Sequence, residues 1–252
     1  MKIAKLVFLI REFFFPRFCA LCGDALLGRE EAWYGLCQDC RESLDGPGEH
    51  GSPERPLERC SVCGRPLISE KDTCLSCRNN EGRSCDRITV VYPYTGRYRK
   101  LLGAYKFGKN PALGHFLEEK LREALCCLTA QGTTVDSSSP AADTVLCPVP
   151  PRSGKLRKTG WDQVEYLAKL LEQDKLPVFR CLKRLPSRSQ KTLGREQRLT
   201  NLKGRFITVK KIPKAVILFD DVITTGATLE ACAAALKDAG AEKVYGIALF
   251  YD

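Results

Sequence analysis

Eight cysteines arranged in four C-x-x-C pairs constrain the fold of this chain more than any other feature. All four pairs lie in the first third of the sequence, at Cys19/Cys22, Cys37/Cys40, Cys60/Cys63 and Cys74/Cys77. A C-x-x-C turn directs two sulfur atoms toward one point, and two such turns complete a tetrahedral shell of four sulfurs around Zn²⁺. Glycine follows two of the pairs, at Gly23 and Gly64, as a tight turn requires. We therefore predict two structural zinc sites with no open position for a substrate.

The spacing alone leaves open which pairs share an ion. Sequential quartets would join the first two pairs and the last two, whereas a cross-brace would interleave them. Disulfide or redox use is the alternative to metal, and it belongs to oxidising compartments. The apolar run at residues 6–10 is too short for a secretory signal or a membrane span. We therefore expect a cytoplasmic protein with metal sites. Residues 3–15 are expected to form a short amphipathic helix that packs on the body of the protein, with a membrane-surface role as the alternative.

The net charge of +10 is concentrated in one part of the chain. Residues 1–84 carry a net charge of −1, and residues 85–252 carry +11. Within the second part, residues 180–214 hold 12 basic residues and a single acid, Glu196. Such a basic patch indicates a polyanionic ligand, which includes phosphates, pyrophosphate and a nucleic-acid backbone.

The residue pattern changes near position 85, which divides the chain into a cysteine-rich head (1–84) and an α/β domain (85–252). We expect strands at 88–92, 144–149, 215–219 and 243–251, and helices at 96–107, 111–128, 162–173 and 227–239. This alternation predicts a parallel sheet covered by helices on both faces. The six remaining cysteines are expected to be small buried hydrophobic residues: Cys85, Cys126, Cys127, Cys147, Cys181 and Cys232.

The strand expected at 215–219 leads directly into two acids, Asp220 and Asp221, and then into a hydroxyl-rich loop around one glycine. Ligands of parallel α/β sheets bind at the carboxyl ends of the strands. Backbone amides of the loop and of the following helix would hold a phosphate, and the two carboxylates would accept hydrogen bonds from a diol, directly or through a divalent cation. The sequence therefore predicts a site for a phosphorylated ribose. The alternative is a plain helix cap at Thr228 beside two solubilising acids.

This segment resembles the phosphoribosyl-pyrophosphate (PRPP) motif of type I phosphoribosyltransferases, in which an apolar strand and two acids precede T-T-G-[AG]-[ST]. The resemblance implies the type I phosphoribosyltransferase fold, with PRPP bound together with Mg²⁺. It places Asp220 and Asp221 on the ribose hydroxyls. It places the loop on the 5′-phosphate, through Thr224, Thr225, Gly226, Ala227 and Thr228.

Residues 17–252 as a whole resemble the ComF family of amidophosphoribosyltransferase-like proteins, which includes proteins of DNA uptake and competence. The shared order is cysteine knuckles, Tyr94 and Lys106-Phe107, a Pro-Val-Pro loop at 148–150, then Gln190, Arg198 and Asn201, and finally the PRPP motif. One segment departs from this pattern. Where the family carries R-G-F-N-Q, this chain has T-G-W-D-Q at residues 159–163, so the arginine is lost and the asparagine is an acid.

Two basic segments occupy the places of the loops that contact pyrophosphate. Arg152 follows the Pro-Val-Pro loop, and residues 184–203 correspond to the flexible loop, where Gln190, Arg195 and Arg198 are candidate ligands. Five basic residues would share one face if the segment were helical. These five are also candidates for contacts with single-stranded DNA: Arg184, Arg188, Lys191, Arg195 and Arg198. The alternative is an ordinary solvated face.

Three functions fit these observations. The first is a ComF-type PRPP-binding protein of DNA uptake or other nucleic-acid handling. The second is an active phosphoribosyltransferase of nucleotide or amine metabolism, for which the sequence indicates no catalytic residue and no acceptor-binding element. The third is a zinc-ribbon module that docks a competence helicase or another protein, a role that is compatible with either of the others.

Overall fold

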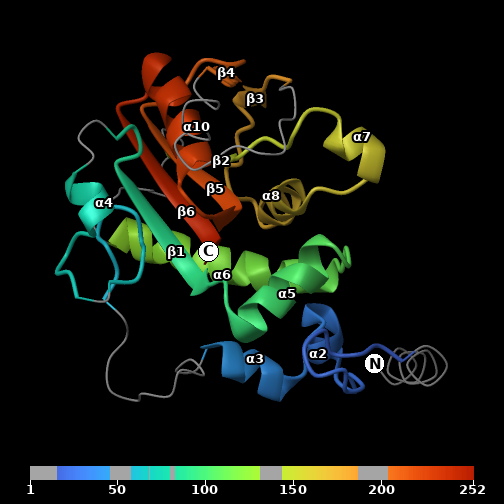
Figure 1. Ribbon diagram of the computed structural model, residues 1–252. Coiled ribbons are helices and arrows are strands. Elements are labelled where there is room, and N and C mark those ends of the chain that lie inside the picture. The colour runs from blue at the N-terminus through green and yellow to red at the C-terminus, as the bar shows by residue number, and fades with distance from the viewer. Residues whose placement is uncertain (1–15, 46–57, 68, 80–82, 131–143, 187–203) are drawn as a thin grey trace. The chain divides into compact units, whose positions relative to one another are not determined.

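The computed structural model describes residues 16–45, 58–67, 69–79, 83–130, 144–186 and 204–252 (Figure 1). The amphipathic helix expected at 3–15 lies outside these ranges. Among the described residues, none of the helices has the length and apolar character needed to cross a membrane.

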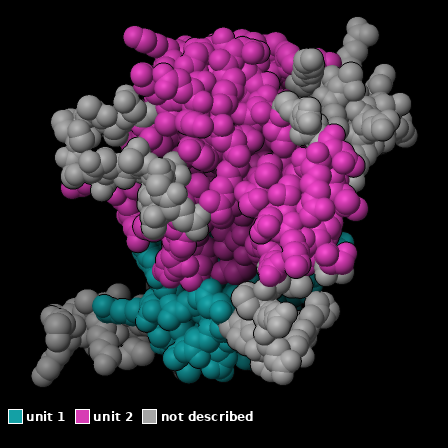
Figure 2. Space-filling model, turned by 90° about the vertical axis from the view of Figure 1, so that its left-hand side faces the viewer, with its two compact units in different colours: residues 1–56, 95–117 teal, residues 57–94, 118–252 magenta. Residues whose placement is uncertain are grey.

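The chain forms two compact units, which Figure 2 distinguishes by colour. Unit 1 contains residues 1–56 and 95–117, and unit 2 contains residues 57–94 and 118–252. The boundaries of these compact units therefore differ from the predicted domain boundary at residue 84. A compact unit need not fold independently, so the domain boundary stays a prediction.

Unit 2 is built on a four-stranded sheet in which every neighbouring pair is parallel (Figure 1). The strands are β1 (Arg87–Pro93), β2 (Thr144–Pro148), β5 (Ala215–Ile223) and β6 (Lys243–Tyr251), in the order β1-β6-β5-β2. Helix α10 (Ala227–Asp238) contacts β5 and β6, and helix α8 (Gln163–Gln173) contacts β2 and β5. The predicted parallel α/β sheet flanked by helices is confirmed.

The central strand β5 is buried on both faces, which explains its continuous apolar run. Val216, Ile217 and Leu218 are completely buried. Alternate side chains of a strand point to opposite faces. Val216 and Leu218 share a core cluster with the α10 residues Leu229 and Cys232, so α10 covers that face. Burial of this kind is typical of parallel sheets. It fixes the position of the two acids that lie further along the same strand.

A short antiparallel hairpin of β3 (Leu182–Arg184) and β4 (Phe206–Thr208) accompanies the sheet. This hairpin was not predicted, because each of its strands is only three residues long. Arg184 therefore lies on a strand, and the helical face proposed for the five basic residues is wrong at its first member. Its guanidinium is 5.4 Å from the centre of the Phe206 ring, in a partly buried position.

Unit 1 contains α2 (Arg29–Tyr34), α3 (Gln38–Asp45), α5 (Gly96–Lys106) and the first residues of α6 (Ala112–Ala130). Side chains of α5 donate to backbone carbonyls of the first cysteine segment: Arg97 to Ser43 at 2.9 Å, and Tyr98 to Leu44 at 3.1 Å. Tyr105 of the same helix is completely buried. These tyrosines are therefore core residues of unit 1.

Candidate metal centres and phosphate site

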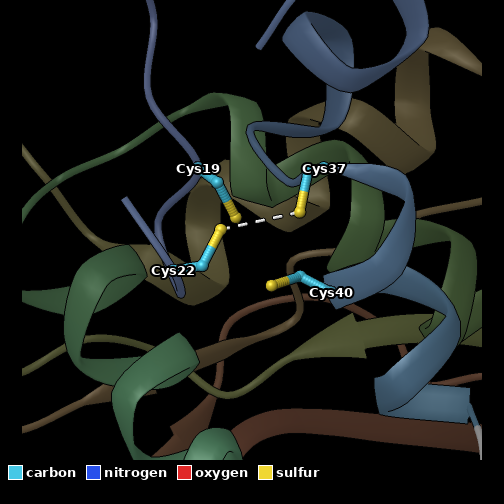
Figure 3. Close-up of side chains that lie close together, drawn as sticks. All are labelled: Cys19, Cys22, Cys37 and Cys40. Carbon is cyan, nitrogen blue, oxygen red and sulfur yellow. Dashed lines mark hydrogen bonds between the residues drawn. The ribbon is translucent and has the colours of Figure 1, made fainter. Parts of the chain in front are cut away.

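The eight cysteines of the C-x-x-C pairs form two separate clusters. One contains Cys19, Cys22, Cys37 and Cys40, and the other contains Cys60, Cys63, Cys74 and Cys77, with the sulfur atoms of each cluster within 4.8 Å of one another. Figure 3 shows the four side chains of the first cluster pointing toward a common centre. The structure thus selects sequential quartets over a cross-brace.

The sulfur spacing in both clusters fits a tetrahedral metal shell. The sulfurs of Cys22 and Cys37 are 3.6 Å apart (Figure 3). The sulfurs of Cys63 and Cys74 in the second cluster are 3.7 Å apart. A metal–sulfur bond of about 2.3 Å gives tetrahedral edges of about 3.8 Å. None of these eight cysteines takes part in a disulfide. Both groups can therefore hold a metal ion.

Local backbone structure produces this convergence. Gly23 and Gly64 both adopt positive φ, at +87° and +70°, and their amides donate to the carbonyl of the first cysteine of their pair. In the second cluster, Cys74 caps the short helix α4 (Leu75–Arg78). Burial opposes ionisation of the Cys60 thiol, yet backbone N–H groups including that of Cys74 donate to it and lower its pKa to about 6. A thiol of low pKa is ready to act as a thiolate ligand.

The second cysteine cluster is seated on the sheet of unit 2. The Ile88 amide of β1 donates to the carbonyl of Val62 at 2.8 Å. Next to it, a Cβ added to Gly64 would lie 2.9 Å from the Val90 side chain. Arg65 donates to the Tyr251 hydroxyl of β6 at 2.6 Å. The two knuckles therefore belong to different compact units, although the sequence makes them look like one repeated head.

The acidic pair lies inside β5 and does not follow it. The predicted strand ended at Phe219, whereas β5 continues through both acids to Ile223 and pairs with β6 along that length. On the other side, β2 ends at Pro148, opposite Phe219, because the prolines that follow cannot continue the ladder. The carboxyl end of β5 is thus open only on the β2 side.

Asp221 is held by a network that runs through Gln163. Only 5% of Asp221 is exposed, and its Oδ2 accepts from the Gln163 Nε2 at 2.7 Å. The Gln163 Oε1 accepts from Lys155 at 2.6 Å, and Lys155 also pairs with Asp162 at 2.7 Å. Asp162 caps α8 by accepting from the amides of Val164 and Glu165. The acid that departs from the family pattern is therefore a helix cap with its own lysine partner.

Asp220 is more accessible than Asp221. Its Oδ1 accepts from the Asp221 amide at 2.8 Å, and it lies within electrostatic range of Arg184. Burial, followed by the nearby charge of Arg152, lowers the pKa of Arg184, and Asp220 opposes that shift. The structure thus gathers one acid and two arginines from three distant segments.

The turn at residues 224–228 has the geometry of a phosphate cradle. Gly226 has φ +80° and is the N-cap residue of α10. Because glycine has no side chain, this residue does not cover the N-terminus of the helix. Thr225 accepts from the Ala227 amide at 3.3 Å. Thr228 lies within the first turn of α10, so it is not the cap considered in the sequence analysis. Helix N-termini of this kind favour anions.

The other basic candidates are not placed by the structure. Arg188, Gln190, Lys191, Arg195 and Arg198 lie outside the described residues.

Comparison with known proteins identifies similar competence proteins. No protein-family profile matches the chain. Competence protein ComFC of Streptococcus pneumoniae is 26% identical over 244 residues, covering 90% of this chain and 96% of that protein. ComFC of Bacillus subtilis is 25% identical, covering 88% and 89%, and competence protein F of Haemophilus influenzae is 25% identical, covering 85% and 90%. The chain is therefore similar to ComF-family proteins over most of its length. This similarity, together with the two four-cysteine clusters, confirms the resemblance drawn from the order of motifs.

Several contacts of these sites were not predicted from the sequence. In the sequence, Gln163 is only the last residue of a divergent motif. The residues next to it in the chain do not indicate its hydrogen bond to Asp221, which lies 58 positions away. Cys147 and Cys181 are both buried, as expected, with their sulfurs 3.5 Å apart. Cys126 and Cys127 are exposed on α6, so their predicted burial is wrong. The buried apolar side chains of that stretch are those of neighbouring residues on the inner face of α6.

Proposed function

We propose that this chain is a competence-type protein of the ComF family whose α/β unit binds PRPP. The observation that carries the proposal is the single edge of the sheet where Asp220 and Asp221 precede the turn capped by Gly226. Carboxylates next to a helix N-terminus suit a ligand that has both hydroxyls and a phosphate. The role in competence is proposed because the similar proteins are competence proteins. A cytoplasmic location is part of the same proposal.

Each part of the site has a proposed role. Asp220 would take the ribose hydroxyls, directly or through Mg²⁺, whose preferred ligands are oxygens. The amides of the turn at 224–228 would hold the 5′-phosphate. Arg152 and Arg184 would contact the pyrophosphate group. Asp221 would support Asp220 from within, since its carboxylate is already bonded to Gln163.

Zinc is the proposed metal of both cysteine clusters. Four thiolates at tetrahedral spacing favour zinc over the harder divalent ions. Because no ligand position remains open, the metal would stabilise the fold and would not take part in a reaction.

Single-stranded DNA is a second proposed ligand, favoured by charge. Residues 180–214 carry a net charge of +11, which exceeds what one pyrophosphate and one phosphate need. Such an excess favours contacts with several backbone phosphates.

Calorimetric titration with PRPP and Mg²⁺ tests the main proposal. Asp220→Asn removes a charge-assisted contact worth roughly 1.5–3 kcal/mol, about ten- to hundredfold in affinity. Asp238→Asn is the matched control, because it removes the same charge from the opposite end of α10. Wild-type protein without PRPP affinity below the millimolar range would refute the proposal. A pyrophosphate-release assay with ammonia, bases and oligonucleotides then separates binding from transfer.

A further inference from the structure

Arg83 connects the second cysteine cluster to the turn that precedes α10. Its Nη1 donates to the Cys77 sulfur at 3.1 Å, and its Nε lies 3.3 Å from the Glu230 carboxylate. Its Nη2 is 3.9 Å from the position that a Cβ on Gly226 would take. Only 15% of the arginine side chain is exposed. One guanidinium therefore contacts a metal-ligating thiol and a helix carboxylate, and lies beside the phosphate turn.

Glu230 ties the same chain segment to the first turn of α10. Its Oε2 accepts from the amides of Ser84 and Cys85 at 2.9 and 3.3 Å. Its own amide donates to the Gly226 carbonyl at 2.9 Å and so closes the first turn of the helix. Loss of Arg83 would therefore remove one of the contacts that hold Glu230, a residue of the first turn of α10.

The charge on the cysteine cluster decides how firmly Arg83 is held. Four thiolates around a divalent ion leave a net charge of −2, which attracts the guanidinium. A bound metal ion would also fix the Cys77 sulfur in place, so that the hydrogen bond from Arg83 has a rigid acceptor. Arg83 has a second effect, because it neutralises a carboxylate that would otherwise repel an anion bound at the turn.

We propose that metal binding at Cys60, Cys63, Cys74 and Cys77 strengthens phosphate binding at residues 224–228 through Arg83. Arg83 is thus a positioning residue that couples two sites of unit 2. The ligand part of this proposal rests on the proposed function, whereas the coupling of knuckle and turn does not. Coupling of binding equilibria is reciprocal, so a phosphorylated ligand also retains metal in this cluster.

The first test measures the turn without any ligand. In zinc-loaded full-length protein, Arg83→Ala is expected to speed hydrogen exchange at the Glu230 amide about five- to tenfold, as a typical coupling between sites implies. Arg78→Ala is the matched control. Arg78 follows Cys77 directly but donates to the Lys71 carbonyl at 2.9 Å, within the knuckle. Zinc content is measured for both variants and is expected to match the wild type. Exchange in Arg83→Ala at the wild-type rate would overturn the coupling.

The second test measures affinity for PRPP in the same three proteins. Arg83→Ala is expected to weaken binding about five- to tenfold, and Arg78→Ala is expected to leave it unchanged. If wild type binds PRPP and Arg83→Ala binds it equally well, the link to the ligand is refuted. If wild type does not bind PRPP, the proposed function fails, and the exchange measurement alone decides whether knuckle and turn are coupled.

A third measurement tests the metal itself. Zinc release to a chromogenic chelator is followed with and without PRPP. We expect PRPP to slow release from one of the two clusters in wild type and in Arg78→Ala, and to have no such effect in Arg83→Ala. Equal slowing in all three proteins would show that Arg83 does not carry the coupling.

Discussion

Alanine substitutions at the two knuckle glycines test whether the second knuckle is an integral part of the sheet unit. Gly23 and Gly64 follow the second cysteine of equivalent pairs, and both adopt positive φ. They differ in their surroundings. A Cβ on Gly23 would meet nothing within 4 Å, whereas a Cβ on Gly64 would lie 2.9 Å from the Val90 Cγ2 and 3.0 Å from the Ile88 carbonyl oxygen.

The difference between the two variants follows from these distances. Left-handed backbone strain at a residue with a Cβ costs about 1–2 kcal/mol, and it applies to both. Gly64→Ala adds overpacking against β1, worth about 1–3 kcal/mol, because a backbone oxygen cannot rotate away as a side chain can. We therefore expect a loss of about 1–2 kcal/mol for Gly23→Ala and about 2–5 kcal/mol for Gly64→Ala.

The two tryptophans of the chain allow each unit to be followed separately. Trp33 belongs to unit 1, where it stacks on His115 with ring centres 3.7 Å apart, and Trp161 belongs to unit 2, beside Tyr166. Urea unfolding of Gly23→Ala is followed by Trp33 fluorescence in a Trp161→Phe background. Gly64→Ala is followed by Trp161 in a Trp33→Phe background. Free zinc is held at one value throughout, since bound metal adds to stability.

Equal losses in the two variants would refute the reasoning. That result would mean that the turn at Gly64 does not pack closely against β1 in solution. The assignment of the second knuckle to unit 2 would then lose its structural support.

Three further predictions concern the metal, the basic segment and pH. Elemental analysis should find close to two zinc ions per chain, and a disulfide-bonded, metal-free protein from reducing conditions would contradict the cysteine assignment. Neutralising Arg188, Lys191 and Arg195 together should weaken single-stranded DNA binding for all sequences and lower the slope of log affinity against log salt by about two, at roughly 0.7 per contact. Anisotropy titrations at several salt concentrations measure this, and wild type that does not bind DNA at low salt would exclude DNA as a ligand. Burial raises the pKa of Glu118 to about 7 from its ordinary 4.5, so its contribution to stability is complete below pH 4.5 and is lost as pH rises through 7. Glu118→Gln should reduce this decline, by about 1–3 kcal/mol between pH 5 and 8, and an unchanged pH profile of urea midpoints would argue against a buried carboxyl.

The sequence by itself determined the features that depend on neighbours in the chain. A C-x-x-C spacing brings two sulfurs together within one turn, so the eight metal ligands follow from the spacing alone. A buried parallel strand requires a continuous apolar run, so both ends of β6 and the start of β5 were predicted correctly, although β5 continues to Ile223, beyond its predicted end at Phe219. The acids and the Gly226 turn were found for the same reason, because they lie within one local segment.

The tertiary structure decided which of these local features share a partner. The structure shows that the cysteines group as sequential quartets. The second knuckle contacts the sheet of unit 2 through pairs such as Arg65 with Tyr251, which lie 186 positions apart. The bond from Gln163 to Asp221 spans 58 positions, and the contact of Ser84 with Glu230 spans 146. No pattern of neighbouring residues encodes such pairs, because they form only when sheet packing brings distant segments to the same place. The chemistry of each site was therefore local and predictable, while its coupling to the rest of the protein was set by the fold.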